Sequence, residues 1–163
     1  MYEALQEEEY LELAQNAASF ILNNLQINGN LYRSFNGKQA EIPAFLDDYA
    51  LFAQALLRLY QATFNEKWAL AAQALLQDAE DKFDDPQSAM FFYTPAGQDD
   101  LIERKMELSD NVIPSSNAVM TENLIVAGKL FYRDDWQERA LQMMANVSKY
   151  IKQNPAFYPA WAT

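Results

Sequence analysis

The chain has 163 residues, of which 50% are apolar and 13% aromatic, a composition typical of a globular protein. Twelve basic residues against 23 acidic ones give a net charge of −11, which repels nucleic-acid phosphates and anionic membrane surfaces. Cysteine and histidine are absent, so disulfides, thiol chemistry, the usual zinc ligands and histidine acid–base catalysis are excluded. We therefore expect no nucleic acid, membrane, metal or cofactor partner.

Two further features concern location and local structure. No apolar run reaches the length of a membrane span, and the first ten residues are acidic where a secretory signal would be basic, which predicts a cytoplasmic protein. The 4 glycines and 6 prolines are few, and this favours long helices joined by well-defined loops.

The first predicted helix runs from about residue 4 to residue 25 and is amphipathic, with apolar residues at helical spacing on one face. The run Asn28-Gly29-Asn30 ends it. Residues 31–35, closed by Asn36-Gly37, are typical of a short hairpin arm.

The second predicted helix, about residues 44–64, follows Pro43 and is apolar around most of its circumference. Its polar side chains form one thin line on a single narrow arc. A helix of this kind is normally covered by neighbours on several sides. The members of the line are Asp47, Gln54, Arg58 and Gln61.

The remaining predicted helices continue this alternation. Residues 66–83 form a simple amphipathic helix, residues 115–132 are again apolar nearly all round, and residues 135–152 have one apolar face. The long connection over residues 84–114 contains two extended-looking stretches, 90–93 and 101–106. Long connections in compact domains are usually functional or packed over another element.

The third and fifth predicted helices repeat one pattern in the same register. Trp136 follows Trp68 by 68 residues, and five further apolar pairs keep that spacing. Both apolar helices also follow a proline, so a long loop, a buried helix, a tight turn and an amphipathic helix occur twice. These pairs are Ala72 and Ala140, Leu75 and Met143, Leu76 and Met144, Ala79 and Val147, and Phe83 and Ile151.

The repeat predicts an all-α fold in which buried inner helices alternate with amphipathic outer helices. Because such hairpins cannot bury their inner helices alone, the array has to curve into a solenoid or close into an (α/α) toroid. A five-helix bundle is the alternative, although a bundle does not require alternate helices to differ. Residues 155–161 are typical of the lead-in to a third inner helix, so we expect residues 1–163 to be one domain, a truncated part of a toroid.

Two motifs carry a resemblance to a known family. Residues 43–50, with 59–64 and Trp68, resemble a segment of the thioredoxin-domain-bearing α/α-toroid proteins related to spermatogenesis-associated protein 20. Residues 110–117 resemble that family's signature Asp-Gly-Ala-x-Pro-Ser-x-Asn, with Asn111 and Val112 in place of the usual Gly-Ala. The similarity covers nearly the whole chain.

The resemblance implies part of the six-hairpin toroid found in glycosidases and in N-acylglucosamine 2-epimerase-like enzymes. The family's amino-terminal thioredoxin-like domain is not in this chain, and no histidine matches those on which the epimerases depend. The fold points to a sugar ligand in the central cavity, by analogy alone. The alternative is a non-catalytic helical interaction module that supports a thioredoxin-like domain. In either case the uncovered toroid edge predicts self-association.

Candidate site residues follow from the toroid. Glycoside hydrolysis requires two carboxylates about 5 to 9.5 Å apart, and Asp48 with Asp110, one from each repeat, is the pair that the sequence favours. Ordinary alternatives are a first-turn acid that complements the helix dipole and a loop or cap hydrogen bond. Expected substrate-binding residues are Arg33, Tyr49, Tyr93, Arg104, Ser115, Ser116 and Asn117. Capping is the alternative for the last three, and surface pairing with nearby acids is the alternative for the two arginines.

Overall fold

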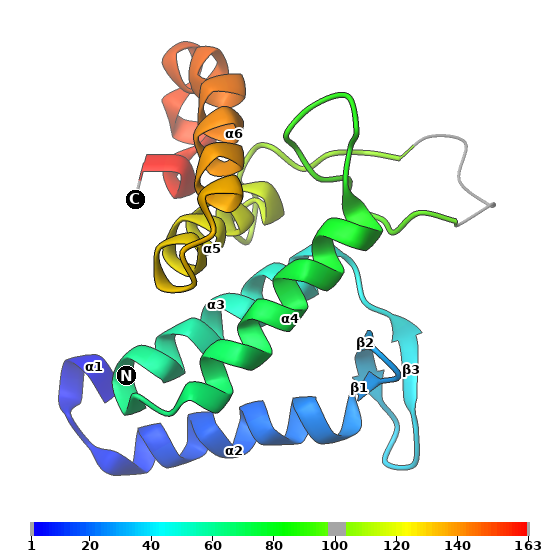
Figure 1. Ribbon diagram of the computed structural model, residues 1–163, viewed down its shortest axis with the longest axis vertical. Helices are drawn as coiled ribbons and strands as arrows, with labels where there is room; N and C mark the ends of the chain where they lie inside the picture. The colour runs from blue at the N-terminus through cyan, green and yellow to red at the C-terminus, as the bar shows by residue number, and fades with distance from the viewer. Residues whose placement is uncertain (1, 98–103, 163) are drawn as a thin grey trace.

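Residues 2–97 and 104–162 are described in a computed structural model, in which two helical hairpins stack beside one further long helix (Figure 1). The first hairpin is α3–α4, the second is α5–α6, and α2 lies along the open side of the first (Figure 1). The elements are α1 (Tyr2–Leu5), α2 (Glu8–Asn24), β1 (Gln26–Ile27), β2 (Asn30–Phe35), β3 (Ala40–Pro43), α3 (Leu46–Thr63), α4 (Glu66–Phe83), α5 (Ser116–Leu130), α6 (Asp134–Gln153) and the short 3₁₀ helices η1 (Pro155–Phe157) and η2 (Pro159–Ala162).

The first helix differs from the prediction. A single helix from residue 4 to residue 25 was wrong at its start, because the chain turns at Gln6, whose φ is 57°. The Gln6 side-chain amide donates to the Glu3 carbonyl at 3.0 Å and stabilises this left-handed turn. The short α1 therefore precedes α2, which begins at Glu8.

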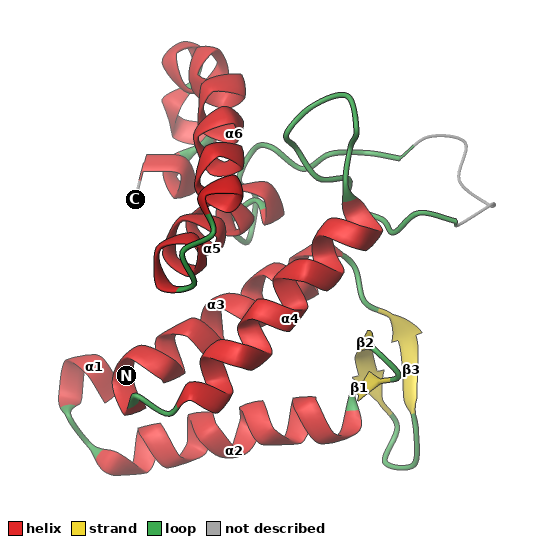
Figure 2. Cartoon of the chain, viewed as in Figure 1, coloured by secondary structure: helices red, strands yellow, loops and turns green. Residues whose placement is uncertain are grey.

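The prediction of a purely helical chain also needs correction, because a small antiparallel sheet with the order β1-β2-β3 connects α2 to α3 (Figure 2). The hairpin arm predicted around Asn36-Gly37 is confirmed as β2 and β3, with Gly37 at φ +90° in the turn. The extra strand β1 pairs with β2 because Asn28 and Gly29 both adopt positive φ and reverse the chain. The fold is therefore mostly helical with a three-stranded sheet.

Helices α3 and α5 are the most enclosed elements, as their apolar circumference predicts. Helix α3 contacts α2, α4 and α5, whereas α4 and α6 bury one face each. The thin polar line of α3 lies at its seam with α5. There the Gln54 amide donates to Glu122 at 2.7 Å, Arg58 pairs with Glu122 at 3.1 Å, and Asn123 donates to the Ala50 carbonyl at 2.8 Å.

The internal repeat is visible in the burial of the outer helices. Trp68 and Trp136 are 1% and 0% exposed, and both members of the pairs that begin with Ala72, Leu75 and Ala79 are also buried. The repeat weakens in α6, where Met144 is 40% exposed although its counterpart in α4 is fully buried. The difference arises because α4 is covered by two neighbours, whereas α6 packs mainly on α5.

The connection between α4 and α5 is irregular over its described residues. The stretch 90–93 forms an isolated bridge between Asp84 and Phe91 and no strand. The predicted extended stretch 101–106 lies partly outside the described residues, and residues 104–106 are irregular. At the other end of the chain, η1 and η2 occupy the predicted lead-in segment, where Trp161 is buried and donates to the Leu108 carbonyl at 2.8 Å.

Within the described ranges, no helix is long and apolar enough to cross a membrane.

Candidate functional site

The N-terminal end of α3 gathers charged side chains from two elements. The Asp48 carboxylate accepts the backbone N–H of Phe45 at 2.9 Å, which caps the helix. Arg33 reaches over from β2, with its guanidinium 3.5 Å from Asp48 and 3.7 Å from Asp47. The guanidinium also lies 4.9 Å from the centre of the Phe45 ring. The sheet before α3 therefore delivers a cation to the two acids of its first turn.

Tyr93 completes one wall of this arrangement. Its ring stacks on Phe45 with centroids 5.1 Å apart, and its carbonyl accepts the backbone N–H of Leu46 at 3.0 Å. Partial burial raises the pKa of the Tyr93 hydroxyl, as does the nearby Asp47 charge, and a hydrogen bond with Arg33 opposes them. An aromatic ring with a polar tip beside charged groups is typical of sites that bind polar ligands.

Glu107 brings a third carboxylate, from the connection before α5. It accepts the Ser116 hydroxyl at 3.3 Å, and partial desolvation raises its pKa, opposed by the Ser116 hydrogen bond and supported by the charge of Asp47. Burial likewise raises the pKa of Asp48, which Phe45 and Arg33 counteract. We call the group of Arg33, Asp47, Asp48, Tyr93, Glu107 and Ser116 the N-terminal cluster.

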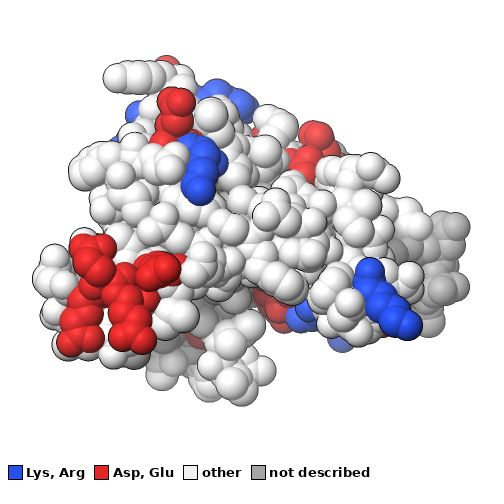
Figure 3. All heavy atoms as spheres, turned by 90° about the horizontal axis from the view of Figure 1, so that it is seen from below, with Lys and Arg blue, Asp and Glu red and all other residues white. Residues whose placement is uncertain are grey.

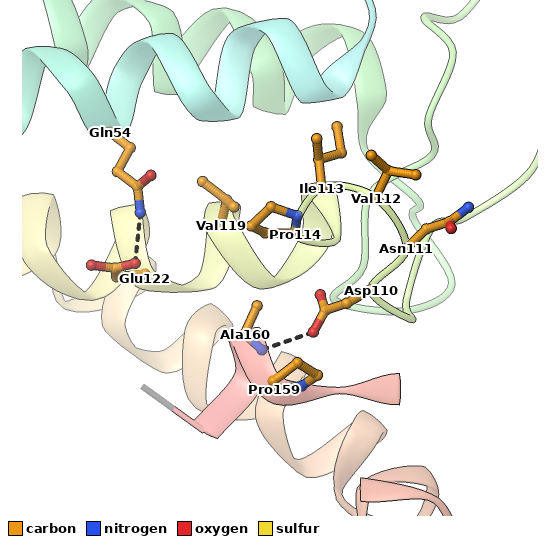
Figure 4. A pocket seen from close by; sticks show the side chains of 10 residues that line it. All are labelled: Gln54, Asp110, Asn111, Val112, Ile113, Pro114, Val119, Glu122, Pro159 and Ala160. Carbon is orange, nitrogen blue, oxygen red and sulfur yellow. Dashed lines mark hydrogen bonds between the residues drawn. The ribbon is translucent and has the colours of Figure 1, made fainter. Parts of the chain in front are cut away.

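A pocket of about 480 Å³ lies between α3, α5, the loop over residues 110–114 and η2 (Figure 4). Gln54 and Glu122 point toward each other across one end and share a hydrogen bond (Figure 4). Asp110 lies at the other end, where Pro159 and Ala160 close the pocket (Figure 4). Between the two ends the lining is mainly apolar.

The pocket and the N-terminal cluster each take a residue from the same face of α3. Gln54 follows Asp47 by seven residues, which is two turns on one face of α3 and about 10 Å along the axis. On α5, Ser116, Val119 and Glu122 are three residues apart, so each step turns by about 60° and Ser116 lies about 120° from Glu122 around the helix.

The residues of the Asp-x-x-x-Pro-Ser-x-Asn signature hold the backbone in place. Asp110 accepts the backbone N–H of Ser115 at 2.7 Å with one oxygen and that of Ala160 at 2.8 Å with the other. Ser115 caps α5, since its hydroxyl oxygen accepts the Ala118 N–H at 3.3 Å. Asn117 is fully buried and binds the N–H and the carbonyl of Phe91. These contacts fix the loop against α5.

Two other predicted site residues lie apart from the cluster. Tyr49 is 2% exposed, packs against Phe83 and accepts the Leu31 N–H at 3.0 Å, so it anchors the sheet to α3. Arg104 donates to the carbonyls of Thr94 and Lys82 and thereby caps the last turn of α4. Burial lowers the pKa of its guanidinium, although it stays charged.

The structure thus brings four predicted site residues, Arg33, Asp48, Tyr93 and Ser116, into one cluster. The nominated pair stays a prediction: Asp48 caps α3 through the Phe45 N–H, and Asp110 binds the N–H groups of Ser115 and Ala160. Sequence reasoning left out Asp47 and Glu107 as site residues. The signal for Asp47 was present, since it begins the polar line of α3, whereas Glu107 gave no local signal in an irregular loop.

The two hairpins with their enclosed inner helices make a mostly helical fold that is similar to that of a solved glycosidase. The solved structure of a GH76 α-mannanase from Bacteroides thetaiotaomicron matches it with a TM-score of 0.68 and 15% identity, over 91% of this chain and 40% of the mannanase chain. At that identity the likeness shows the fold alone.

In sequence, the chain is homologous over most of its length to the spermatogenesis-associated protein 20-like proteins, which confirms the predicted resemblance. It is 30% identical over 169 residues to an uncharacterized protein of Caenorhabditis elegans, a match that covers 99% of this chain and 23% of the relative. Spermatogenesis-associated protein 20 of Mus musculus is 32% identical over 117 residues, which cover 71% of this chain and 15% of the mouse protein. The human protein of the same name is 27% identical over 167 residues, which cover 95% of this chain and 21% of the human protein. The chain spans less than a quarter of these relatives' length. No protein-family model matches it.

Proposed function

We propose that this chain is part of a toroid that binds and processes a carbohydrate along the seam of α3 and α5. The observation that carries the proposal is the pocket of about 480 Å³ between the two inner helices, which has Glu122 and Gln54 at one end and Asp110 at the other. Small-ligand sites are commonly mostly apolar hollows of this size with a few convergent polar groups.

The chemistry of these groups suits a sugar. The Glu122 carboxylate accepts hydrogen bonds and the Gln54 amide both donates and accepts them, so the two together can bind vicinal hydroxyls. Their side chains bind each other, and Arg58 holds the second oxygen of Glu122 at 3.1 Å. A ligand would replace the Gln54 bond while Arg58 keeps the carboxylate in position.

Processing would use the N-terminal cluster. Glu107 has a raised pKa and an exposed side, which suits a group that donates a proton to a leaving oxygen. Asp47, whose charge acts on Glu107 and which Arg33 holds in place, is the partner carboxylate. A pair of carboxyl groups is the minimum that most glycosidases require. We propose this pair because both oxygens of Asp110 already bind backbone N–H groups.

The experiment is a binding titration with α-manno-oligosaccharides, the ligand class that the GH76 α-mannanase suggests, with β-gluco-oligosaccharides for comparison. We expect Glu122→Gln to weaken binding about tenfold to a hundredfold, because a hydrogen bond to a charged group contributes about 1.5–3 kcal/mol. Glu138→Gln on the exposed side of α6 is the matched control and should bind as the wild type does. Equal binding by the Glu122 and Glu138 variants, or no binding of either sugar class, would contradict the proposal.

A further inference from the structure

The part of the pocket between its two polar ends is lined by aliphatic residues. Val119 and Pro114 follow the Gln54–Glu122 pair, and the loop tip with two further aliphatic side chains lies beyond them (Figure 4). The residues that line the pocket in the described part of the chain include no aromatic ring. We call this part the aliphatic stretch, and its members are Val112, Ile113, Pro114 and Val119.

The backbone of the aliphatic stretch offers few hydrogen-bond donors. Pro114 has no backbone N–H, and neither has Pro159 across the pocket. The N–H of Ser115 donates to Asp110 at 2.7 Å, and that of Val119 donates to the Ser115 carbonyl at 3.1 Å. A sugar hydroxyl buried here would lose hydrogen bonds to water without replacing them, which costs free energy. The aliphatic stretch therefore disfavours a second sugar ring and favours an apolar group.

The pocket is long enough for a sugar ring followed by a short chain. Glu122 comes seven residues after Ser115, the N-cap of α5, which is about 10 Å along the helix axis. With a sugar ring about 5 Å across beside Glu122, the remaining length of about 5 Å holds about four carbons of an extended chain, because C–C bonds are about 1.5 Å long. The volume of about 480 Å³ agrees with this, since small-ligand sites usually measure about 300–1,000 Å³.

The loop tip is held in place although its side chains are exposed. Val112 and Ile113 are 95% and 45% exposed. The N–H of Asn111 donates to the Ile113 carbonyl at 3.1 Å, and the N–H of Asp110 donates to the Phe157 carbonyl at 2.7 Å. The loop thus presents two apolar side chains to solvent at the edge of the pocket. An aliphatic ligand group that covers them removes apolar surface from water, which is favourable.

The charge of the molecule favours a glycoside in solution over one that is embedded in a membrane. The net charge is −11. Acidic side chains gather at one end of the face in Figure 3, whereas the basic side chains on it are scattered. Anionic lipid surfaces attract clusters of basic residues and repel a protein of this charge. We therefore expect the apolar group to be short, as the length of the pocket also indicates.

We propose that the pocket binds glycosides in which a short aliphatic aglycone is attached to the sugar. The inference rests on the proposed function, because it assigns the sugar ring to Glu122 and Gln54. It adds that the non-sugar part of the ligand lies on the aliphatic stretch. The substrate class is therefore short-chain alkyl glycosides, in preference to longer oligosaccharides.

Ligand-observed NMR titrations compare methyl and butyl α-mannopyranosides, with methyl and butyl β-glucopyranosides as the second sugar class. Each fully buried CH₂ group strengthens binding by up to about fourfold, so the three extra CH₂ groups of the butyl glycoside, if half buried, should strengthen it about eightfold. The double variant Val112→Ser with Ile113→Ser should lose most of this gain. Its binding of the methyl glycoside should stay unchanged, which also shows that its site is still folded.

Two further variants complete the experiment. Leu141→Ser on α6 also replaces a large exposed aliphatic side chain, and as the control it should keep the full gain. Glu122→Gln should weaken the methyl and the butyl glycoside by the same factor, because Glu122 contacts only the sugar.

The failure of this inference differs from the failure of the proposed function. Equal affinities of the methyl and butyl glycosides, or a gain that persists in the double variant, would overturn the inference and leave the sugar site intact. No binding of any of the four glycosides would overturn both. Binding of butan-1-ol as tight as that of the butyl glycoside would also overturn both, because the sugar would then contribute nothing. Co-sedimentation of the chain with vesicles of phosphatidylcholine and phosphatidylserine would overturn the assignment of a short aglycone in solution.

Discussion

Replacement of Asn117 by alanine tests how the long connection is held against α5. The Asn117 side chain has no exposed surface and makes three hydrogen bonds to that connection. Its oxygen accepts the Phe91 N–H at 2.9 Å, and its amide donates to the carbonyls of Phe91 and Glu107, both at 3.0 Å. The amide thus pairs with the backbone of Phe91 as a neighbouring strand would.

The expected loss follows from what the substitution leaves behind. Phe91 is fully buried, so its N–H and carbonyl cannot exchange Asn117 for water, and each unsatisfied buried group costs about 1–3 kcal/mol. The Glu107 carbonyl belongs to an exposed residue and should be hydrated at little cost. We therefore expect Asn117→Ala to lower the free energy of unfolding by about 3 kcal/mol, or the melting temperature by about 6–12 °C.

Asn123→Ala is the matched control, because Asn123 is an equally buried asparagine of α5 whose amide donates to the Ala50 carbonyl. It removes the same side-chain volume, so both variants lose the same packing. Beyond that shared loss, Asn123→Ala should lower the free energy of unfolding by only about 1 kcal/mol. Urea unfolding followed by circular dichroism measures both variants. A loss for Asn117→Ala no larger than that for Asn123→Ala would refute the reasoning, because it would mean that Phe91 does not depend on this side chain.

Two further predictions concern single positions. Gly128→Ala should lower the free energy of unfolding by about 1–3 kcal/mol, although alanine favours helices. The reason is that the new Cβ would lie 2.8 Å from the Gln137 side chain and 3.1 Å from the Arg133 carbonyl. A raised melting temperature would contradict this, because it would mean that α6 shifts at little cost in free energy. The free energy of unfolding of Asp48→Asn, taken relative to the wild type, should be higher at about pH 7 than at about pH 3, as measured by urea titrations at both values. Burial raises the pKa of Asp48, so its ionisation in the folded state costs free energy that is absent below its unfolded pKa and complete above its folded pKa. An equal difference at both pH values would mean that Arg33 and the Phe45 N–H fully compensate that burial.

The helices and their alternation could be predicted because they depend on short-range patterns. The spacing of Trp68 and Trp136 defined the repeat, and the apolar circumference of α3 indicated neighbours on several sides, which its contacts with α2, α4 and α5 confirm. The break at Gln6 could not be predicted, since glutamine is an ordinary helix former and its left-handed turn depends on hydrogen bonds back to α1.

The sequence by itself determined where the chain is helical, which helices are enclosed and which family it resembles. Hydrophobic periodicity and motifs depend only on residues that are close together in the chain. Only the tertiary structure decided the candidate site. Arg33, Asp47 and Glu107 come from a strand, a helix and an irregular loop, and no local pattern measures the distance between them. The same holds for Asp110, whose second oxygen binds the N–H of a residue 50 positions later. Long-range packing therefore selected which acids hold the backbone and which lie on the seam between the inner helices.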